Sequence, residues 1–356
     1  MKNLSFINKI LFLINSLLLV GQTLSYLAPF VSPNIFWPIA FFGLLFPVFF
    51  ILNLLFLTFW LIVMKKPFWA NLIVLIIGMN SISTLIGNSE EKSTKEGENN
   101  FSIMSYNVRL FNAYNWIKKE GVKNEIFDLF NQRNTNILCI QEFYAPKQLP
   151  ESDYSFQHIG LQSKKSQWHM AIYSKFPQIN KGTVSIKGER MNNTCIFSDM
   201  VFQGDTIRIY NIHLASNWFD KSDLAFMENP EISKEAIKKG VFGIGKRLKN
   251  SFQKRAMQVE VIKQHMEKSP YTIIVCGDFN DTPNSFAYHK ISEGLEDAFL
   301  NKGKGIGSTF LGKIPFLRID YILHSPKFKT NTFTTHQKKL SDHKAIESSL
   351  GFLKQR

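Results

Sequence analysis

The chain has 356 residues, of which 45% are hydrophobic and 20% are charged, and its formal net charge is +14 at pH 7. This balance excludes a wholly disordered chain, a collagen-like repeat and a small disulfide-rich scaffold. Residues 1–88 contain four lysines and no Asp, Glu or Arg, so the rest of the chain carries 38 of the 42 basic side chains and all 28 acidic ones. The sequence therefore predicts two regions of different character.

Residues 10–64 form an uncharged, mostly apolar stretch. One membrane-spanning helix needs only ~20 apolar residues, so this stretch predicts more than one helix. Pro33 and Asn34 favour a turn, and we expect the second span to be tilted or frayed at Trp37-Pro38. A cleavable signal peptide is the alternative for the first span, but its apolar core has only ~7–15 residues. The expected spans are residues 10–31, 35–64 and 68–87.

The lysines predict an orientation for this three-span anchor, residues 1–87. With three spans, Lys2, Lys9, Lys65 and Lys66 all fall on one side of the membrane, which the positive-inside rule makes the cytoplasmic side. An odd number of crossings then places the rest of the chain outside. We therefore expect an integral protein of the inner or plasma membrane, with a periplasmic or extracellular domain after a polar linker at residues 88–100.

Residues 101–356 have the pattern of one α/β domain. Val122, Ile126, Leu129 and Phe130 lie at helical spacing, and a second, long helix is expected before Tyr271. Short apolar runs predict strands at 103–106, 137–140, 170–173, 194–202, 207–212, 271–276 and 319–323. A Lys-rich insertion without clear periodicity, residues 217–247, is expected to be a loop. Three cysteines without CxxC spacing indicate buried thiols, and argue against a disulfide framework and a zinc site.

Acidic, amide and histidine side chains stand at the ends of these predicted strands. In an α/β fold, side chains at strand ends emerge into a cleft. Each alone is more often a turn residue or a helix cap, but six such clusters in one domain predict a functional site. The residues are Asn107, Glu142, Asn211, His213, Asp278, Asn280, Asp281, Asp320, Asp342 and His343.

The motifs that hold these residues resemble the endonuclease/exonuclease/phosphatase superfamily. They are Ser-Tyr-Asn-Val-Arg, Ile-Gln-Glu, Tyr-Asn-Ile-His-Leu, Gly-Asp-Phe-Asn-Asp, Arg-Ile-Asp-Tyr-Ile-Leu and Ser-Asp-His, and they run in the family's order over residues 101–351. The resemblance implies a four-layer α/β sandwich of two mixed sheets flanked by helices, here preceded by the three predicted transmembrane helices. It also implies hydrolysis of phosphoester bonds.

The resemblance further implies a metal site and roles for individual residues. Glu142 would be the central metal ligand, with Asn107 and Asp342 close to the metal. Mg²⁺ suits these oxygen ligands, with Mn²⁺ or Ca²⁺ as alternatives. Asp278 would orient and deprotonate the attacking water, and Asp320 would hydrogen-bond to His343. The residues expected to contact the phosphate are Asn211, Asn280, Arg109, His213 and His343.

His213 places the chain nearer the deoxyribonucleases, sphingomyelinases and phosphatases of the superfamily, because abasic-site endonucleases carry Tyr at that position. The sequence offers Gln167 and His169 near the strand from which a partner of His213 would come. A surface position is the simpler interpretation of His169.

Three functions fit these observations. The first is a metal-dependent nuclease acting outside the cytoplasm, which the net +10 after residue 88 would favour by attracting polyanions. The second is a lipid-headgroup phosphodiesterase or phosphatase that benefits from the membrane anchor. The third is an inactive phosphate-binding module. The lipid bilayer is the expected partner of residues 1–87, and no obligate protein partner is predicted.

Overall fold

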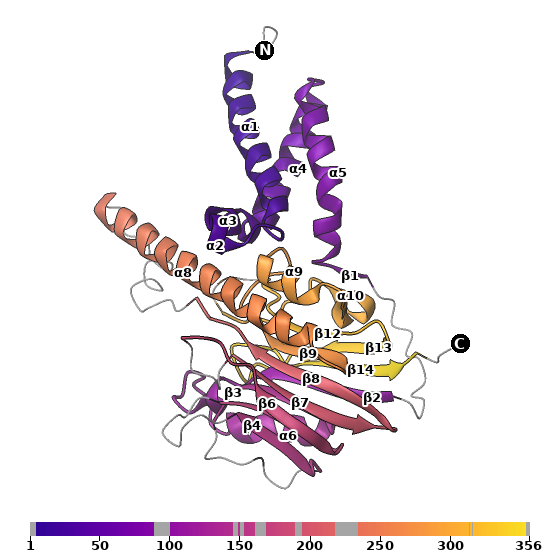
Figure 1. The fold of residues 1–356 in the computed structure, drawn as a ribbon. Coiled ribbons are helices and arrows are strands. Elements are labelled where there is room, and N and C mark those ends of the chain that lie inside the picture. The colour runs from indigo at the N-terminus through magenta and orange to yellow at the C-terminus, as the bar shows by residue number, and fades with distance from the viewer. Residues whose placement is uncertain are drawn as a thin grey trace. The chain divides into compact units, whose positions relative to one another are not determined.

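The computed structural model describes residues 5–88, 100–144, 149, 153–160, 169–188, 194–217, 234–312, 314 and 316–353, with the side chains of 234–239 left aside. The chain forms two compact units (Figure 1). The helical unit comprises Met1–Thr84, Ser216–Met257 and Pro283–Lys290, and the sheet unit comprises Leu85–Ala215, Gln258–Thr282 and Ile291–Arg356. In these units, two segments of the predicted C-terminal domain, Ser216–Met257 and Pro283–Lys290, group with the N-terminal helices. Most of the predicted linker lies outside the described residues.

The N-terminal part of the helical unit is built from apolar helices. They are α1 (Phe6–Leu27), α2 (Pro33–Phe36), α3 (Pro38–Leu44), α4 (Phe46–Ile62) and α5 (Pro67–Ser83). Ser5 caps α1 by accepting a hydrogen bond from the backbone N–H of Asn8. The later four helices each have proline in their first positions, where the missing N–H costs nothing.

The prediction of three full membrane spans is wrong by helix length. Among the described residues, α1, with 22 residues, is the one helix long and apolar enough to cross a membrane. A second candidate span exists only if α3 and α4 are counted as one broken helix, and these two are bent by 63° relative to each other. The break falls where Pro47 follows Leu45 and Phe46, because proline removes a helical hydrogen bond and clashes with the preceding turn. Helix α5 has only 17 residues.

A cluster of asparagines is buried between α1, α4 and α5. The Asn15 amide N–H₂ donates to Oδ1 of Asn53 (3.2 Å) and of Asn71 (2.9 Å). Its Oδ1 accepts from Nδ2 of Asn71 and from Nε1 of Trp60, both at 2.8 Å. The remaining amide hydrogens bond to backbone carbonyls, including that of Pro67. The network is uncharged and satisfied within the bundle.

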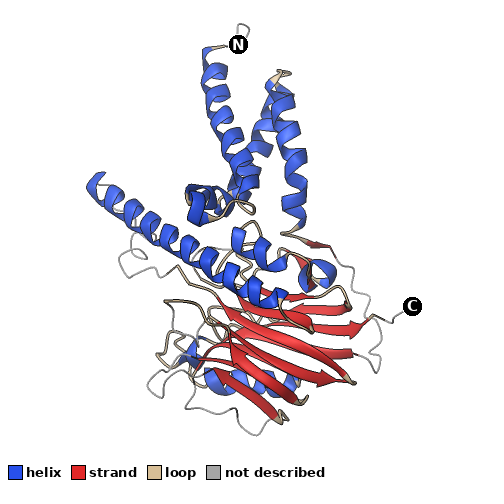
Figure 2. Cartoon of the chain, viewed as in Figure 1, coloured by secondary structure: helices blue, strands red, loops and turns tan. Residues whose placement is uncertain are grey.

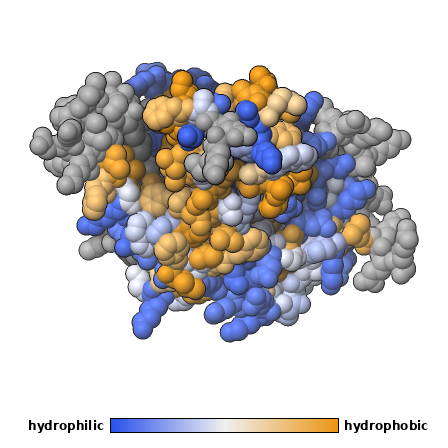
Figure 3. All heavy atoms as spheres, turned by 90° about the horizontal axis from the view of Figure 1, so that it is seen from above, coloured by the Kyte–Doolittle hydropathy of each residue, from blue (hydrophilic) through white to orange (hydrophobic). Residues whose placement is uncertain are grey.

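The outer faces of these helices carry apolar side chains. Figure 3 shows hydrophobic residues across much of the face it presents. Ile7, Leu17, Ile62 and Ile77 are each at least 60% exposed. A water-soluble domain seldom exposes an apolar surface of this extent.

The sheet unit contains two six-stranded mixed sheets (Figure 2). One has the order β10 (Glu296–Asp297), β12 (Asp320–His324), β9 (Thr272–Asp278), β8 (Asp205–His213), β7 (Cys195–Phe202) and β6 (Gln178–Thr183). The other has the order β13 (Phe328–Thr335), β14 (Ile346–Phe352), β2 (Asn100–Asn107), β3 (Ile137–Phe143), β5 (His169–Ser174) and β4 (Phe156–Gly160). The pairs β2–β3 and β8–β9 are parallel, and the other pairs are antiparallel. A short ribbon pairs β1 (Gly87–Asn88) with β11 (Lys304–Gly305).

Alternation along the strands produces two hydrophobic cores. Ile103 of β2 joins Ile209 and Ile274 of the other sheet in the core between the sheets. Met104, its neighbour, faces helix α6 (Val122–Arg133), because successive strand residues point to opposite faces. The predicted α/β fold of two mixed sheets flanked by helices is confirmed. The three cysteines are buried and unbridged, as expected.

The predicted loop at residues 217–247 is partly wrong. Helix α8 runs from Lys234 to Glu267 and includes the predicted helix, whereas residues 218–233 lie outside the described part. Glycines 240, 243 and 245 lower helix propensity by about 1 kcal/mol each, but extending an existing helix is much easier than nucleating one. Within the described residues, the remaining helices are α9 (Phe286–Ser292), α10 (Ala298–Lys302) and the 3₁₀ helix η1 (Arg109–Asn112).

Candidate active site

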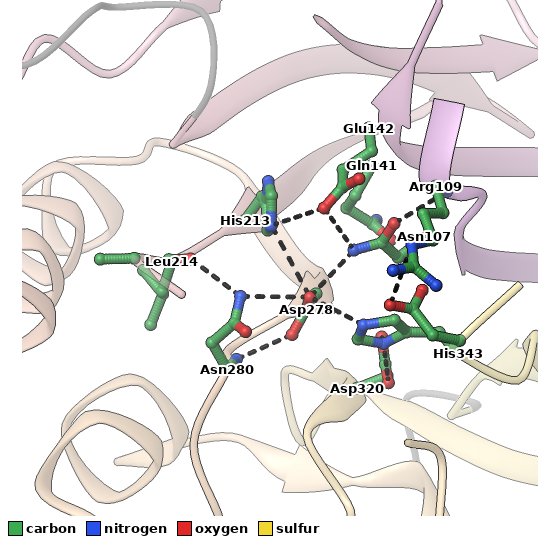
Figure 4. A network of polar contacts seen from close by, with 12 residues as sticks. Asn107, Arg109, Gln141, Glu142, His213, Leu214, Asp278, Asn280, Asp320 and His343 are labelled. Atoms are coloured by element: carbon green, nitrogen blue, oxygen red, sulfur yellow. Dashed lines mark hydrogen bonds and ion pairs between the residues drawn. The ribbon is translucent and has the colours of Figure 1, made fainter. Parts of the chain in front are cut away.

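Two pairs of parallel strands bring the predicted residues together (Figure 4). In β8 and β9, His213 is the register partner of Asp278, so both stand at the same sheet edge. In β2 and β3, Asn107 is paired with Gln141, and Glu142 follows directly. Because the carboxyl ends of parallel strands share an edge, residues distant in sequence converge there.

Asp278 lies at the centre of the cluster and is 1% exposed. Its Oδ2 accepts from Nδ2 of Asn107 (3.0 Å) and of Asn280 (3.2 Å), and its Oδ1 accepts from the Asn280 backbone N–H (2.8 Å). Nε2 of His213 and Nε2 of His343 lie 3.7 and 3.5 Å from Oδ2. Burial raises the pKa of Asp278, and the two histidines partly offset this. The carboxylate is therefore more basic than an exposed aspartate.

The backbone at the cluster is held in unusual conformations. Glu142 and Asn280 have positive φ angles, 50° and 51°, which non-glycine residues seldom adopt. Gly277, at φ 141°, precedes Asp278, and a Cβ there would collide with the carbonyl oxygen of Ile212. Glycine is therefore required for the close approach of β8 to β9.

His343 and Asp320 form the expected hydrogen-bonded pair. Nδ1 of His343 lies 2.9 Å from Oδ2 of Asp320, and both residues are buried. Burial alone would lower the pKa of His343, but the carboxylates of Asp320 and Asp278 raise it well above its usual value. These carboxylates therefore favour the protonated form of His343, and Asp320 fixes the orientation of its ring.

The pKa of His213 is shifted in the opposite direction to that of His343, and the pKa of the neighbouring Glu142 is raised. The closest atoms of His213 and Glu142, Nε2 and Oε1, are 3.8 Å apart. Burial lowers the pKa of His213 despite the nearby Asp278 carboxylate. Burial, together with repulsion from Asp342 and Asp278, raises the pKa of Glu142 to about 7. The Asp278 carboxylate thus lies between two imidazoles whose pKa values are shifted in opposite directions.

The donor set at this edge fits a divalent cation. Glu142, Asp342 and the Asn107 amide offer oxygen atoms, which are the ligands that hard divalent cations prefer. The pKa of Glu142 is raised first by burial and then by the nearby Asp342 carboxylate, and a bound cation would offset both effects. Donor atoms of Asp278, Asp320 and His343 also lie within 4.8 Å of one another. We favour the first set, because the His343–Asp320 hydrogen bond and the charge on His343 oppose metal ligation by that histidine.

Arg109 lies beside these ligands. Its Nε is 3.3 Å from Oδ2 of Asp342, and its backbone N–H donates to Oδ1 of Asn107 (3.1 Å). The guanidinium is partly exposed, so it can also reach an anion that enters from solvent.

The structure does not bring Asn211 into the cluster. Asn211 is fully buried, its Nδ2 donates to the carbonyls of Ile140 and Ala171, and its Oδ1 accepts from Gln141. Its side chain therefore links the two sheets, and the prediction that it contacts phosphate is not supported. His169 is also buried, contrary to its expected surface position, and Gln167 lies outside the described residues.

Three supporting residues were not predicted from the sequence. The Oγ1 of Thr309 accepts from the backbone N–H groups of Ile319 and Asp320, which fixes the start of β12. Ser341 donates to the Asn107 carbonyl at 2.8 Å. The Phe310 ring packs edge-on against His343, with centroids 5.4 Å apart. Strand-end patterns give no signal for such residues, because their partners are distant in sequence.

The two packed mixed sheets, with a buried acid–base cluster at the strand ends, are the arrangement of a phosphoesterase. The family model described as Endonuclease/Exonuclease/phosphatase family matches residues 104–343, and the chain belongs to this family. Members of this superfamily hydrolyse phosphoester bonds and generally use a divalent metal. Residues 8–85 match a separate model, described as a domain of unknown function. No curated protein matches the chain.

Several solved structures share the fold at low sequence identity. An endonuclease/exonuclease/phosphatase family protein from Bacteroides thetaiotaomicron is 16% identical, with a TM-score of 0.52. The match covers 71% of this chain and 98% of that protein. A mannosyl-6-phosphatase from the same organism is 17% identical, with a TM-score of 0.51. The match covers 71% of this chain and all of that chain. D. rerio TDP2 complexed with single-strand DNA product is 16% identical, with a TM-score of 0.52 and the same coverage.

Proposed function

We propose that this chain is a membrane-anchored, divalent-metal-dependent phosphodiesterase that hydrolyses nucleic acid. The observation that carries the proposal is the position of Asp278, a buried carboxylate whose Oδ2 lies 3.7 Å from Nε2 of His213 and 3.5 Å from Nε2 of His343. Hydrolysis of a phosphodiester needs a base for water, positive charge near the phosphoryl oxygens and a proton for the leaving oxygen. The cluster offers each of these.

Asp278 would orient and deprotonate the attacking water. Its raised pKa makes it a stronger base than an exposed aspartate, and the Asn280 backbone N–H holds it in place. His343 would place its charge near the phosphoryl group and supply a proton to the leaving oxygen. Asp320 fixes the orientation of His343 and keeps its ring protonated.

The other residues would bind the phosphate and the metal. Asn280, Arg109 and the neutral His213 would contact phosphate oxygens. Glu142, Asn107 and Asp342 would hold a divalent cation, most suitably Mg²⁺. When bound, the cation would act as a Lewis acid on a phosphoryl oxygen.

Nucleic acid is the substrate that we favour. The net charge of +10 after residue 88 would attract a polyanion and speed its encounter with the site. The fold accommodates such a ligand in D. rerio TDP2, whose structure contains a single-strand DNA product.

The N-terminal helices would anchor the enzyme in a bilayer. The apolar length of α1 and the exposed side chains of α4 and α5 support this proposal. We further propose that the N-terminus is cytoplasmic and the phosphoesterase region periplasmic or extracellular, which requires an odd number of crossings, such as α1 alone. A reporter fused after Gly87 that is active only in the cytoplasm would contradict this orientation.

The proposed activity is tested with the full-length chain in detergent, supplied with Mg²⁺ or with EDTA. The substrates are single-stranded DNA, RNA and vesicles of phosphatidylcholine and sphingomyelin. We expect Mg²⁺-dependent cleavage of nucleic acid, abolished by EDTA. Release of phosphorylated headgroup without nucleic-acid cleavage would replace the nuclease by a lipid phosphodiesterase, and turnover of neither would favour a binding module.

A further inference from the structure

Two exposed aromatic side chains, Tyr114 and Trp116, lie in the loop that follows η1. Tyr114 is 60% exposed and Trp116 is 38% exposed. Their ring centroids are 5.1 Å apart, with 60° between the ring planes. No other Tyr or Trp in the described part of the sheet unit is as exposed. Large aromatic rings usually bury much of their apolar surface, so an exposed pair is a candidate contact surface.

The loop holds the pair in a fixed position. Residues Arg109–Asn112 all have positive φ angles, between 44° and 58°. This conformation is disfavoured for L-residues, and it is stabilised here by the buried side chains of Leu110 and Phe111. The Asn112 side chain also makes two hydrogen bonds of 2.9 Å to the backbone of Ile117. Tyr114 and Trp116 thus lie between two fixed points, and their exposure does not come from a frayed segment.

Arg109 connects the pair to the candidate active site. The guanidinium carbon of Arg109 lies 4.5 Å from the centroid of the Trp116 ring. The same guanidinium contacts Asp342, one of the proposed metal ligands. Because the ring planes are 60° apart, a planar group would stack on one ring of the pair, one side chain away from the proposed phosphate site.

The surroundings of the pair favour a neutral planar ring as its ligand. Aromatic pairs also bind quaternary ammonium groups such as choline, through the negative faces of their rings. Here the positive charge of Arg109 already lies over Trp116, so a second cation would be repelled. A nucleobase is planar and uncharged, and it is attached to a phosphate that Arg109 can bind.

We propose that Tyr114 and Trp116 form a stacking platform for a nucleobase next to the scissile phosphate. The inference rests on the proposed function and specifies its substrate as single-stranded nucleic acid or short nucleotides. In a duplex, each base is already stacked on its neighbours and must be extruded to reach a protein ring. Stacking tolerates all four bases because every base has a π-face, so the platform would select for single strands without selecting a sequence.

The test uses substrates with a single phosphodiester bond. These are the dinucleotide TpT and its two analogues in which one thymidine is replaced by an abasic tetrahydrofuran nucleoside. The full-length enzyme in detergent with Mg²⁺ is compared with Tyr114→Ala and Trp116→Phe. The control is Ile179→Ala, which removes a similarly exposed apolar side chain on β6. Products are quantified by chromatography, and thermal unfolding confirms that each variant is folded.

The platform predicts an effect that depends on the base. Tyr114→Ala should reduce kcat/KM for TpT by about 5- to 100-fold, mainly through KM, because one stacking contact is lost. The same variant should cleave one abasic analogue as fast as the unmutated enzyme does. Trp116→Phe should retain most of the activity, because it keeps an aromatic ring, and Ile179→Ala should change nothing.

Other outcomes overturn the inference in distinguishable ways. Equal losses on TpT and on both abasic analogues would show that Tyr114 acts on the phosphate, the sugar or the loop, with no base contact. An unchanged kcat/KM for TpT would exclude the platform directly. If the unmutated enzyme cleaves none of the three dinucleotides but hydrolyses lipid vesicles, the proposed function itself fails, and the platform fails with it.

Discussion

The helical unit and the sheet unit each bury a cluster of polar side chains, but the two clusters differ in how their polarity is balanced. Around Asn15, uncharged amides donate and accept among themselves, and each donor has a partner. Around Asp278, burial raises the pKa of Asp278 and of Glu142, and neighbouring carboxylates raise both further. The first cluster is balanced within the protein, whereas the second has negative charge that the protein alone does not neutralise.

This difference separates a structural cluster from a chemical one. A fully satisfied neutral network fixes which helices pack together and in what register. A buried cluster with perturbed pKa values is unfavourable for folding but suited to catalysis and to binding a cation. Substitutions in the two clusters should therefore have opposite effects on stability and on activity.

The largest expected effect is on turnover. Asp278→Asn or His343→Ala should lower kcat by about 10³-fold or more, because each removes a group that transfers a proton or stabilises charge. The measurement is hydrolysis of single-stranded DNA with Mg²⁺, alongside thermal unfolding to confirm folding. Asp205→Asn, at the exposed start of β8, is the matched control and should retain full activity. Near-normal turnover in Asp278→Asn would remove the proposed base.

The second effect concerns Glu142 and has opposite signs for stability and activity. Its pKa is about 7 in the folded protein, against an ordinary value of 4.5. Between these two pH values the folded state holds the proton and the unfolded state does not, so the stability of the metal-free protein should fall as pH rises from 4.5 to 7. Glu142→Gln should remove this trend and stabilise the metal-free protein above pH 7 by up to about 3 kcal/mol, while abolishing activity.

Denaturant unfolding in EDTA at several pH values measures this effect. Adding Mg²⁺ should stabilise the unmutated protein more than Glu142→Gln, because a ligand that binds only the folded state shifts the unfolding equilibrium. A Glu142→Gln variant that is less stable in EDTA at pH 8 would show that the carboxylate is already compensated within the protein.

The smallest expected effect is on the helical cluster. Asn15→Leu should destabilise the bundle by about 1–2 kcal/mol, because it leaves donors and acceptors of Trp60, Asn53 and Asn71 without partners. Asn80→Leu, at an exposed position of α5, is the matched control. Thermal unfolding in detergent compares the two variants. Equal stabilities would contradict a structural role for the cluster.

Most of the fold was predictable because its central strands are apolar and alternate. Strands β4, β6, β10 and β13 were missed at the sheet edges, where the sequence is more polar and the alternation signal is weak. Strand β14 was missed as well, although it lies between β13 and β2, because two serines and a glycine interrupt its apolar pattern. The asparagine cluster was missed as well. The sequence does not show that single amides on different apolar helices face one another. The absence of charge in the same stretch did predict that it forms apolar helices.

The strand-end signal brought together most of the side chains predicted to form the site, although their roles stay predictions. Asn211 and His213 point to the same side of β8, as alternation requires. Asn211 is two residues further from the strand end, about 7 Å deeper at the usual rise per residue. There it meets Gln141 of the other sheet and not the cleft. A linear pattern gives the direction of a side chain but not its depth in the sandwich.

The burial of all three cysteines has a practical consequence for testing the proposed membrane orientation. Cys139, Cys195 and Cys276 have no exposed sulfur for a reagent to reach, and burial raises the thiol pKa of Cys195 and Cys276. Alkylating reagents attack the thiolate, so the native chain should be almost inert to maleimides. A single cysteine introduced at exposed Ile86 or Ile179 would then be the one rapidly labelled position. Membrane-impermeant labelling of intact cells could report which side each position faces without first replacing a native residue.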